Sequence, residues 1–151
     1  MLFTDGFPKG LGKFSPAEFA PAKELPDDEF PFVLNTGRYR EHWHTGTMTR
    51  RAKALDALSP EPLADMHPDD LQMLGIRDGE VVRLRSRRGE IVLKARASKR
   101  MTRGSVFVPF HFKEAAANLL TIDALDPYGK IPEFKFCAVQ VERLEGAMSF
   151  R

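Results

Sequence analysis

The chain has 151 residues and a formal net charge of +2; 42% of its residues are hydrophobic and 29% are charged. This length fits one domain with one core, and this composition excludes the disordered, collagen-like and membrane-spanning classes. The longest apolar runs fall far short of the roughly 20 residues that a membrane-spanning helix requires. The single cysteine, Cys137, excludes an internal disulfide framework, and the N-terminus lacks a secretion signal. We therefore expect a cytoplasmic protein without a membrane span.

Residues 1–30 are expected to form an extended arm. Prolines and glycines recur through this segment, and no helical or strand periodicity is sustained in it. Phenylalanines recur as well, which a free linker would not need; they are Phe3, Phe7, Phe14, Phe19 and Phe30. The arm is therefore predicted to lie across a surface, either of this domain or of a neighbour.

The globular domain is assigned to residues 31–145, with residues 146–151 as a C-terminal tail. A short apolar strand at 32–34 leads into a turn-forming sequence at 35–38. Near-helical spacing of apolar residues predicts a helix at 47–58, ended by Pro60. A second short helix is predicted at 67–75, because Pro68 stands at its start and Gly75 follows its end.

Strict alternation of apolar and polar residues predicts a hairpin at residues 80–97, with Arg88 and Gly89 in its turn. Further strands are predicted at 105–110 and 136–142, and residues 114–120 have a helical pattern. Several short strands with a few short helices between them favour a mainly β fold, a barrel rather than a layered βαβ arrangement.

The clearest candidate for a ligand site is the segment TGRYREHWHTGTMTRR at residues 36–51. Thr36, Gly37 and Arg38 directly follow a buried strand, where a backbone without a side chain can approach a phosphate and a guanidinium can bind it. The next residues, His42 to Thr47, combine tryptophan, two histidines, two threonines and a glycine. Such a set can stack on a flat heterocycle and hydrogen-bond to its polar edges.

Two other hypotheses for the role of the histidines are that they bind zinc and that they act in acid–base catalysis. The remaining soft ligands are His67, His111 and Cys137, but no third ligand stands at a spacing typical of a metal site. No nucleophile or orienting carboxylate stands near the histidines in sequence, so catalysis ranks below ligand binding. Cys137 lies in an apolar alternating strand and is read as a small buried hydrophobe.

Further candidates lie later in the chain. Asn118 either ends a helical segment or offers its amide to a heterocycle edge, and Lys135 beside Phe134 is either solvated or meets a phosphate. Basic residues gather between Arg83 and Arg103, where Glu90 is the only acid. This stretch is either a solvated strand face or an interface with an anionic cofactor, a partner domain or nucleic acid.

Four blocks carry a family resemblance: TGRYREHWHTGTMTRR, LGIRDGEVVRLRSRRGEI, GSVFVPFHFKEAAANLLT and ALDPYGKIPEFKFCAVQVE. In this order they resemble the C-terminal domain of the dimethyl-sulfoxide-reductase family of molybdenum and tungsten enzymes. The resemblance covers about residues 31–143 and is greatest to formate dehydrogenase catalytic subunits. It implies a six-stranded double-psi β-barrel with short inserted helices.

The resemblance also implies the ligand, bis(molybdopterin guanine dinucleotide), with molybdenum or tungsten ligated outside this chain. The residues that it assigns to cofactor binding are Thr36, Gly37 and Arg38 in a first loop, His42, His44, Thr45 and Gly46 in a second, and His111, Asn118, Phe134 and Lys135 after them. No catalytic residue and no metal ligand is assigned within the chain.

The function implied is that of the C-terminal domain or small subunit of a molybdenum or tungsten oxidoreductase, a formate dehydrogenase by preference. A larger chain would carry the iron–sulfur and substrate domains, so the chain alone is not expected to be active. The alternatives are the equivalent domain of an assimilatory nitrate reductase and a non-catalytic binding or assembly module that uses the basic hairpin at 83–103. No nucleic-acid partner is expected.

Overall fold

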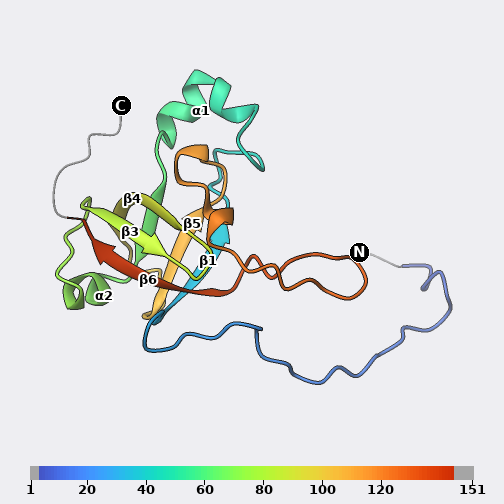
Figure 1. Ribbon diagram of the computed structural model, residues 1–151. Coiled ribbons are helices and arrows are strands. Elements are labelled where there is room, and N and C mark those ends of the chain that lie inside the picture. Colours follow the sequence, from blue (N-terminus) through green and yellow to red (C-terminus); the bar gives the residue numbers. More distant parts are fainter. Residues whose placement is uncertain (1–3, 145–151) are drawn as a thin grey trace.

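The computed structural model describes residues 4–144, in which six strands close into a barrel (Figure 1). The strands are β1 Phe32–Gly37, β2 Leu63–Met66, β3 Val81–Arg85, β4 Glu90–Ala97, β5 Ser105–Pro109 and β6 Cys137–Arg143. The helices are α1 Lys53–Leu58 and α2 Pro68–Met73, with single 3₁₀ turns η1 Thr49–Arg51, η2 Lys113–Ala115 and η3 Ala117–Leu119. The chain is thus mainly β with short inserted helices, as predicted.

The strands follow one another around the barrel in the order β1-β5-β2-β4-β3-β6. The pairs β1·β5 and β2·β4 are parallel, and the other four pairs are antiparallel. This is the double-psi β-barrel expected from the sequence. Closure leaves no strand with a free edge, so every strand has a partner on both sides.

Alternate residues of each strand face the interior of the barrel and form its core. The core is made of aliphatic side chains from all six strands, among them Leu34, Met66, Val82, Leu84, Leu93, Val106, Val108 and Val139, each at most 1% exposed. The alternation of residues 82–97 therefore separates inside from outside as the sequence predicts. Cys137 is fully buried in the same core.

Three predicted elements differ from the structure. The strand predicted at 32–34 continues through Thr36 and Gly37, because both pair in register with β5. The helix predicted at 47–58 is interrupted at Ala52, whose ψ of 105° is extended, and this splits it into η1 and α1. Residues 114–120 form two 3₁₀ turns rather than one helix, because Ala116 between them is also extended.

The strand β2 was not predicted. It has only four residues and follows two prolines, Pro60 and Pro62, which mark a loop. Tertiary pairing defines it instead, since β2 lies between β4 and β5. The burial of its residues alternates, with Ala64 and Met66 inside, but its sequence does not show this, because Leu63 is apolar as well.

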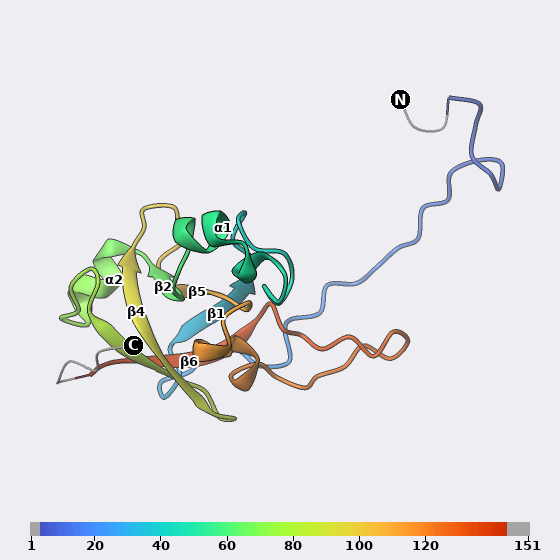
Figure 2. The ribbon, with the colours of Figure 1, turned by 90° about the horizontal axis from the view of Figure 1, so that it is seen from above.

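The N-terminal arm extends away from the barrel and is anchored to it only near its end, around residues 24–30 (Figures 1 and 2). Glu24 and Phe30 are buried against the barrel, whereas Phe14 and Phe19 are almost fully exposed. The tail predicted at 146–151 lies outside the described residues. Among residues 4–144, none of the helices has the length and apolar character needed to span a bilayer.

Candidate functional site

The predicted site residues gather where β1 and β5 end. These strands are parallel, so their carboxyl ends lie at the same edge of the barrel, with Thr36 beside Val108 and Gly37 beside Pro109. The segment that begins at Arg38 follows one strand, and His111 follows the other. The backbone of Phe110 donates to the carbonyl oxygen of Gly37 at 3.1 Å, which holds the two segments together.

Thr36 joins this edge to the segment that precedes β6. Its buried hydroxyl donates to the carbonyl oxygen of Phe134 at 2.6 Å. In return, Nζ of Lys135 donates to the carbonyl oxygen of Thr36 at 2.6 Å. Lys135 is otherwise exposed and keeps two further N–H donors, because an ammonium group carries three.

Asn118 and Phe134 line one open cleft of about 300 Å³ together with Phe110, Thr121 and Pro132. Asn118 is exposed within η3, and its amide faces no hydrogen-bond partner among residues 4–144. An amide beside two aromatic rings is suited to a flat polar heterocycle. Phe110, Thr121 and Pro132 were not singled out from the sequence, because single apolar or hydroxyl residues carry no signal of their own.

Gly37 has a packing role. A Cβ at this position would lie 2.3 Å from the nearest atom of the Phe107 ring, so any larger residue requires that ring to move. From the sequence, Gly37 is expected to let a phosphate approach the backbone. In the structure, the close contact with Phe107 is a second reason for a glycine at this position. Gly46 is also constrained, with φ of +71° and an added Cβ 3.2 Å from the carbonyl oxygen of His111.

His42 is a buried structural residue, only 3% exposed. Its Nε2 lies 2.8 Å from the carbonyl oxygen of Ser59, which can only accept, so Nε2 carries the proton. Nδ1 then accepts from the hydroxyl of Thr49 at 3.2 Å when the ring is neutral. Because both nitrogens are engaged, His42 fixes the loop and is poorly placed to act as an acid–base catalyst.

His111 is buried beside His42, with 4.8 Å between the ring centroids. Neither of its ring nitrogens has a hydrogen-bond partner among residues 4–144. The pKa of His111 is lowered to about 4, mainly by burial and in smaller part by the neighbouring His42 and Arg50. His111 is therefore neutral near pH 7 and holds one donor and one acceptor that the described protein leaves unused.

The loop that follows β1 places several groups at the surface. The guanidinium of Arg38 lies 5.8 Å from the ring centroid of Trp43, a residue that is 64% exposed. His44 stands edge-on to Trp43 in a left-handed conformation, with φ of 46°. The hydroxyl groups of Thr45 and Thr47 lie 2.8 Å apart. Arg38 forms no hydrogen bond or ion pair within residues 4–144, so its guanidinium is available to an anion.

The other sequence candidates do not join this site. Within residues 4–144, no group of three histidine, cysteine or acidic side chains is placed to hold a metal ion. Nδ1 of His67 accepts from the backbone of Asp69 and caps α2, and Cys137 lies inside the barrel. The zinc reading of the histidines therefore has no support in the described structure.

The basic hairpin is largely neutralised by acids from distant parts of the chain. Ion pairs join Arg83 to Glu90 and Glu142, Arg85 to Glu29, Arg87 to Glu24 and Asp27, Arg88 to Glu24, Lys94 to Glu61, Arg96 to Asp65 and Arg103 to Asp69 and Asp70. A surface whose cations are already paired offers little to nucleic-acid phosphates. Apart from Glu90, these acids could not be recognised as partners from the sequence, because they lie far away along the chain.

Comparison with known families is consistent with this geometry. Residues 32–138 match the family described as Molydopterin dinucleotide binding domain. The chain belongs to this family. The F420-dependent formate dehydrogenase subunit alpha of Methanocaldococcus jannaschii is 51% identical over 135 residues, which make up 89% of this chain and 20% of the relative. The F420-dependent formate dehydrogenase 1 subunit alpha of Methanococcus maripaludis is 44% identical over 137 residues, covering 91% of this chain and 20% of the relative.

The family resemblance inferred from the sequence is thus confirmed, and formate dehydrogenase alpha subunits are homologues of this dinucleotide-binding domain. Acetylene hydratase from Pelobacter acetylenicus shares the fold, with a TM-score of 0.70 and 18% identity over 83% of this chain and 21% of that structure. The chain spans about a fifth of the length of the curated relatives that it matches.

Proposed function

We propose that this chain binds the guanine dinucleotide and pterin portion of bis(molybdopterin guanine dinucleotide) for a formate-dehydrogenase-like oxidoreductase. It does so as the C-terminal domain or small subunit of that enzyme. The observation that carries the proposal is the joint position of Arg38, Asn118 and Lys135 at the ends of β1 and β5, each with polar groups left unused by residues 4–144. Membership of the dinucleotide-binding family supports the same assignment.

The residues present fit a ligand that combines phosphates with flat heterocycles. Arg38 and Lys135 supply cations for phosphates, while Asn118 and Phe134 supply an amide and a ring beside an open cleft. His111 adds an unsatisfied donor and acceptor behind them. When bound, the cofactor supplies the redox chemistry of its metal, molybdenum or tungsten, and the residues of this chain hold and orient its organic part.

The proposed site residues then divide into two groups. Arg38, His44, Thr45, Asn118 and Lys135 are exposed and would contact the ligand directly. Thr36, Gly37, His42 and Gly46 are buried and would hold the first group in place; buried His111 and half-buried Phe134 would do the same and would also offer the ligand unpaired nitrogens and a ring. We propose that a larger chain carries the metal ligand and the substrate and iron–sulfur domains, since the homologous relatives are about five times longer.

Formate dehydrogenase is preferred to nitrate reductase because both relatives described above are formate dehydrogenase alpha subunits. The binding-module alternative, which uses the hairpin at 83–103, is disfavoured by the ion pairs that already occupy most of its cations. We infer that the chain alone does not oxidise formate, and formate turnover by the purified chain would contradict this part of the proposal.

The test is cofactor retention by the chain expressed in a host that makes the cofactor. Guanine nucleotide and oxidised pterin released by acid are measured per mole of purified chain. Arg38→Met and Lys135→Met should each lower retention by about tenfold, because a charge-assisted hydrogen bond contributes roughly 1.5–3 kcal/mol. Lys99→Met, at an exposed cation outside the site, should retain as much as the wild type. Equal retention by all three variants would refute the assignment.

A further inference from the structure

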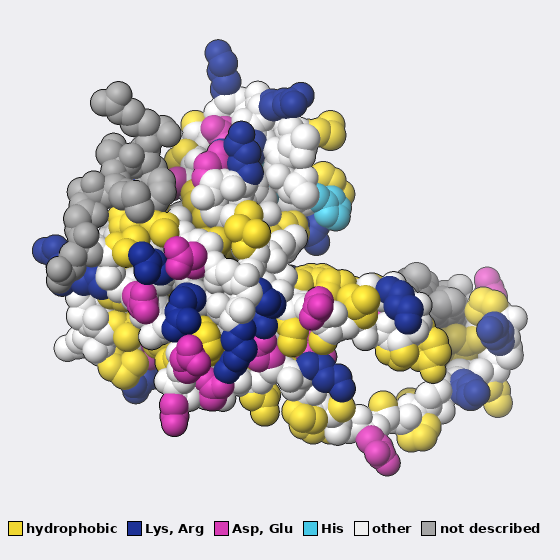
Figure 3. Space-filling view, viewed as in Figure 1, with side chains coloured by type: hydrophobic (Ala, Val, Ile, Leu, Met, Phe, Trp, Pro, Cys, Tyr) yellow, Lys and Arg dark blue, Asp and Glu magenta, His cyan; other side chains and the backbone are white. Residues whose placement is uncertain are grey.

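Two segments of the chain extend from the barrel and expose large apolar side chains to solvent. We call them the two limbs: residues 4–23 of the arm and residues 123–135 before β6. Both leave the barrel on the same side in two perpendicular views (Figures 1 and 2), and apolar side chains recur along both in the space-filling view (Figure 3). Neither segment is explained by the proposed cofactor site alone.

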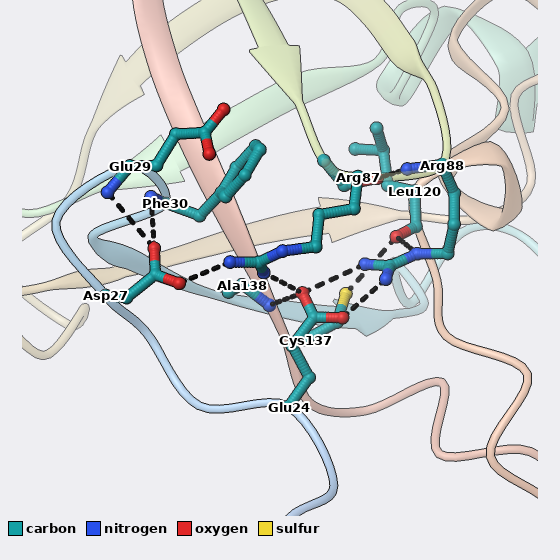
Figure 4. Close-up of polar contacts among 10 residues, drawn as sticks. Glu24, Asp27, Glu29, Phe30, Arg87, Arg88, Leu120, Cys137 and Ala138 are labelled. Carbon is teal, nitrogen blue, oxygen red and sulfur yellow. Dashed lines mark hydrogen bonds and ion pairs between the residues drawn. The ribbon is translucent and has the colours of Figure 1, made fainter.

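The first limb is held at its base by a buried acid. Glu24 is only 9% exposed and meets Arg87, Arg88 and the backbone N–H of Ala138 (Figure 4). Burial raises the pKa of Glu24, but the hydrogen bonds from Arg88 and Ala138 lower it more, so its net pKa lies below the ordinary value. The arm is therefore fixed where it departs from the barrel.

A second contact strengthens this base. Asp27 pairs with Arg87, and the ring of Phe30 lies under both Arg85 and Arg87, whose guanidinium carbons are 4.9 and 4.4 Å from its centroid. Beyond Glu24, toward the N-terminus, the barrel covers the arm no longer. Leu11 is 93% exposed, Phe14 100% and Phe19 92%.

The second limb is held in its conformation by hydrogen bonds among its own residues. The carboxylate of Asp126 accepts from the backbone N–H groups of Tyr128, Gly129 and Ile131 at 2.7–2.9 Å. A bridge between Leu125 and Pro132 closes the same loop. The loop is therefore ordered by polar contacts while its apolar side chains point outward: Tyr128 is 94% exposed, Ile131 60% and Leu125 55%.

The two limbs meet at their bases. The backbone N–H of Lys23 donates to the carboxylate of Glu133 at 2.9 Å. The last two residues of the second limb, Phe134 and Lys135, contact Thr36 in the cofactor site. A partner bound between the limbs would consequently sit beside the proposed dinucleotide site.

The exposed area matches a protein interface. A buried aromatic side chain covers roughly 150–250 Å², so Phe14, Phe19 and Tyr128 together would bury roughly 450–750 Å². With Leu11, Leu125 and Ile131 added, the total approaches the roughly 800 Å² per partner of a standard protein interface. Large exposed apolar surfaces on a folded domain mark interaction sites.

We propose that the two limbs bind an apolar surface on the remainder of the longer catalytic polypeptide, which rests on the proposed function. Two observations favour this occupant: the homologous relatives are about five times longer than this chain, and the second limb ends in the cofactor site. A membrane surface fits less well, because the limbs carry acids and bases in similar number, without a basic face.

The test measures association between the wild-type chain and the M. jannaschii alpha subunit lacking its matched region. The two should bind in sedimentation and calorimetry. Phe14→Ser with Phe19→Ser should weaken binding at least tenfold, and Tyr128→Ser with Ile131→Ser should do the same. The control is Met73→Ser on α2, a residue 65% exposed and away from the limbs, which should bind as the wild type does.

If the truncated subunit shows no cooperative unfolding, it is not folded, and the test is made on a chimera instead. In this chimera, the present chain replaces the matched region of the full-length relative. Maleimide labelling of Tyr128→Cys should then be at least tenfold slower than in the isolated chain. Equal labelling, or binding unaffected by the limb substitutions, would overturn the proposal. So would limb-dependent self-association or flotation with phospholipid vesicles. Cofactor retention is measured on the same limb variants in the isolated chain, so loss of docking is distinguished from loss of the dinucleotide site.

Discussion

Lys135 and Thr36 lie 99 positions apart in the chain, yet Nζ of Lys135 donates to the carbonyl oxygen of Thr36 at 2.6 Å. The hydroxyl of Thr36 donates in the opposite direction, to the carbonyl oxygen of Phe134. This exchange joins the end of β1 to the entrance of β6. Lys135, which we propose binds phosphate, is thereby positioned by the barrel before any ligand arrives, and this reduces the ordering cost of binding.

Replacing Thr36 by valine should destabilise the protein by about 1–2 kcal/mol, because the carbonyl oxygen of Phe134 loses its buried donor while side-chain volume is nearly kept. The free energy of unfolding is measured by urea titration. Thr45→Val is the control: its hydroxyl is exposed, so the change should stay within about 0.5 kcal/mol. Equal effects at the two positions would show that the Thr36 hydrogen bond does not stabilise the fold.

The pKa of His111, lowered to about 4, predicts how stability depends on pH. In the unfolded chain a histidine takes up a proton near pH 6.5, whereas folded His111 resists protonation until about pH 4. Protons therefore favour the unfolded state within this window. The free energy of unfolding should fall as pH drops from 6.5 to 4, by up to about 3 kcal/mol from this group.

His111→Phe should flatten this part of the stability curve, because it removes the group whose lowered pKa produces the slope. At pH 7 the substitution also removes two buried nitrogens that have no hydrogen-bond partner. It abolishes any hydrogen bond from this position to the cofactor. His44→Phe, at an exposed histidine, should leave the curve as it is. A His111 variant with the wild-type pH dependence would contradict the assignment.

The sequence predicted the parts of the barrel in which local pattern and tertiary burial agree. The alternation through Val82, Leu84, Ile91 and Leu93 predicts both strands of the β3–β4 hairpin and their inward faces. The four-residue strand β2 is different, because its identity depends on pairing with β4 and β5 rather than on its own residues. Likewise, Ala116 takes an extended conformation that its helical propensity opposes.

The sequence predicted which residues belong to the site but not how they are arranged. The histidine-rich loop stood out by composition, yet composition could not show that His42 is buried and bonded to Ser59 while His44 is exposed. Loops lack the periodicity that reveals burial in strands and helices. Glu24 had no signal at all, since its partner Arg88 lies 64 positions away. Whether the predicted residues contact the cofactor stays a prediction.

Replacing Gly37 by alanine should destabilise the barrel by about 1–3 kcal/mol, because the new methyl group would overlap the ring of Phe107. Unfolding in urea measures the loss. Adding Phe107→Leu should recover part of it by making room, which gives a favourable coupling energy in the double-mutant cycle. Strictly additive effects would place the role of Gly37 elsewhere, for example at the ligand.

Glu24→Gln should release the arm from the barrel, because a neutral amide leaves the half-buried guanidinium of Arg88 without its charged partner. The cost to stability should be about 1–3 kcal/mol, since breaking one side of a desolvated pair leaves the other uncompensated. Limited proteolysis should then cut residues 20–30 faster, whereas the barrel stays intact. Glu29→Gln is the matched control, because the side chain of Glu29 is exposed and pairs only with the guanidinium of Arg85. Protection of the arm in both variants would mean that Phe30, stacked under Arg85 and Arg87, suffices to anchor it.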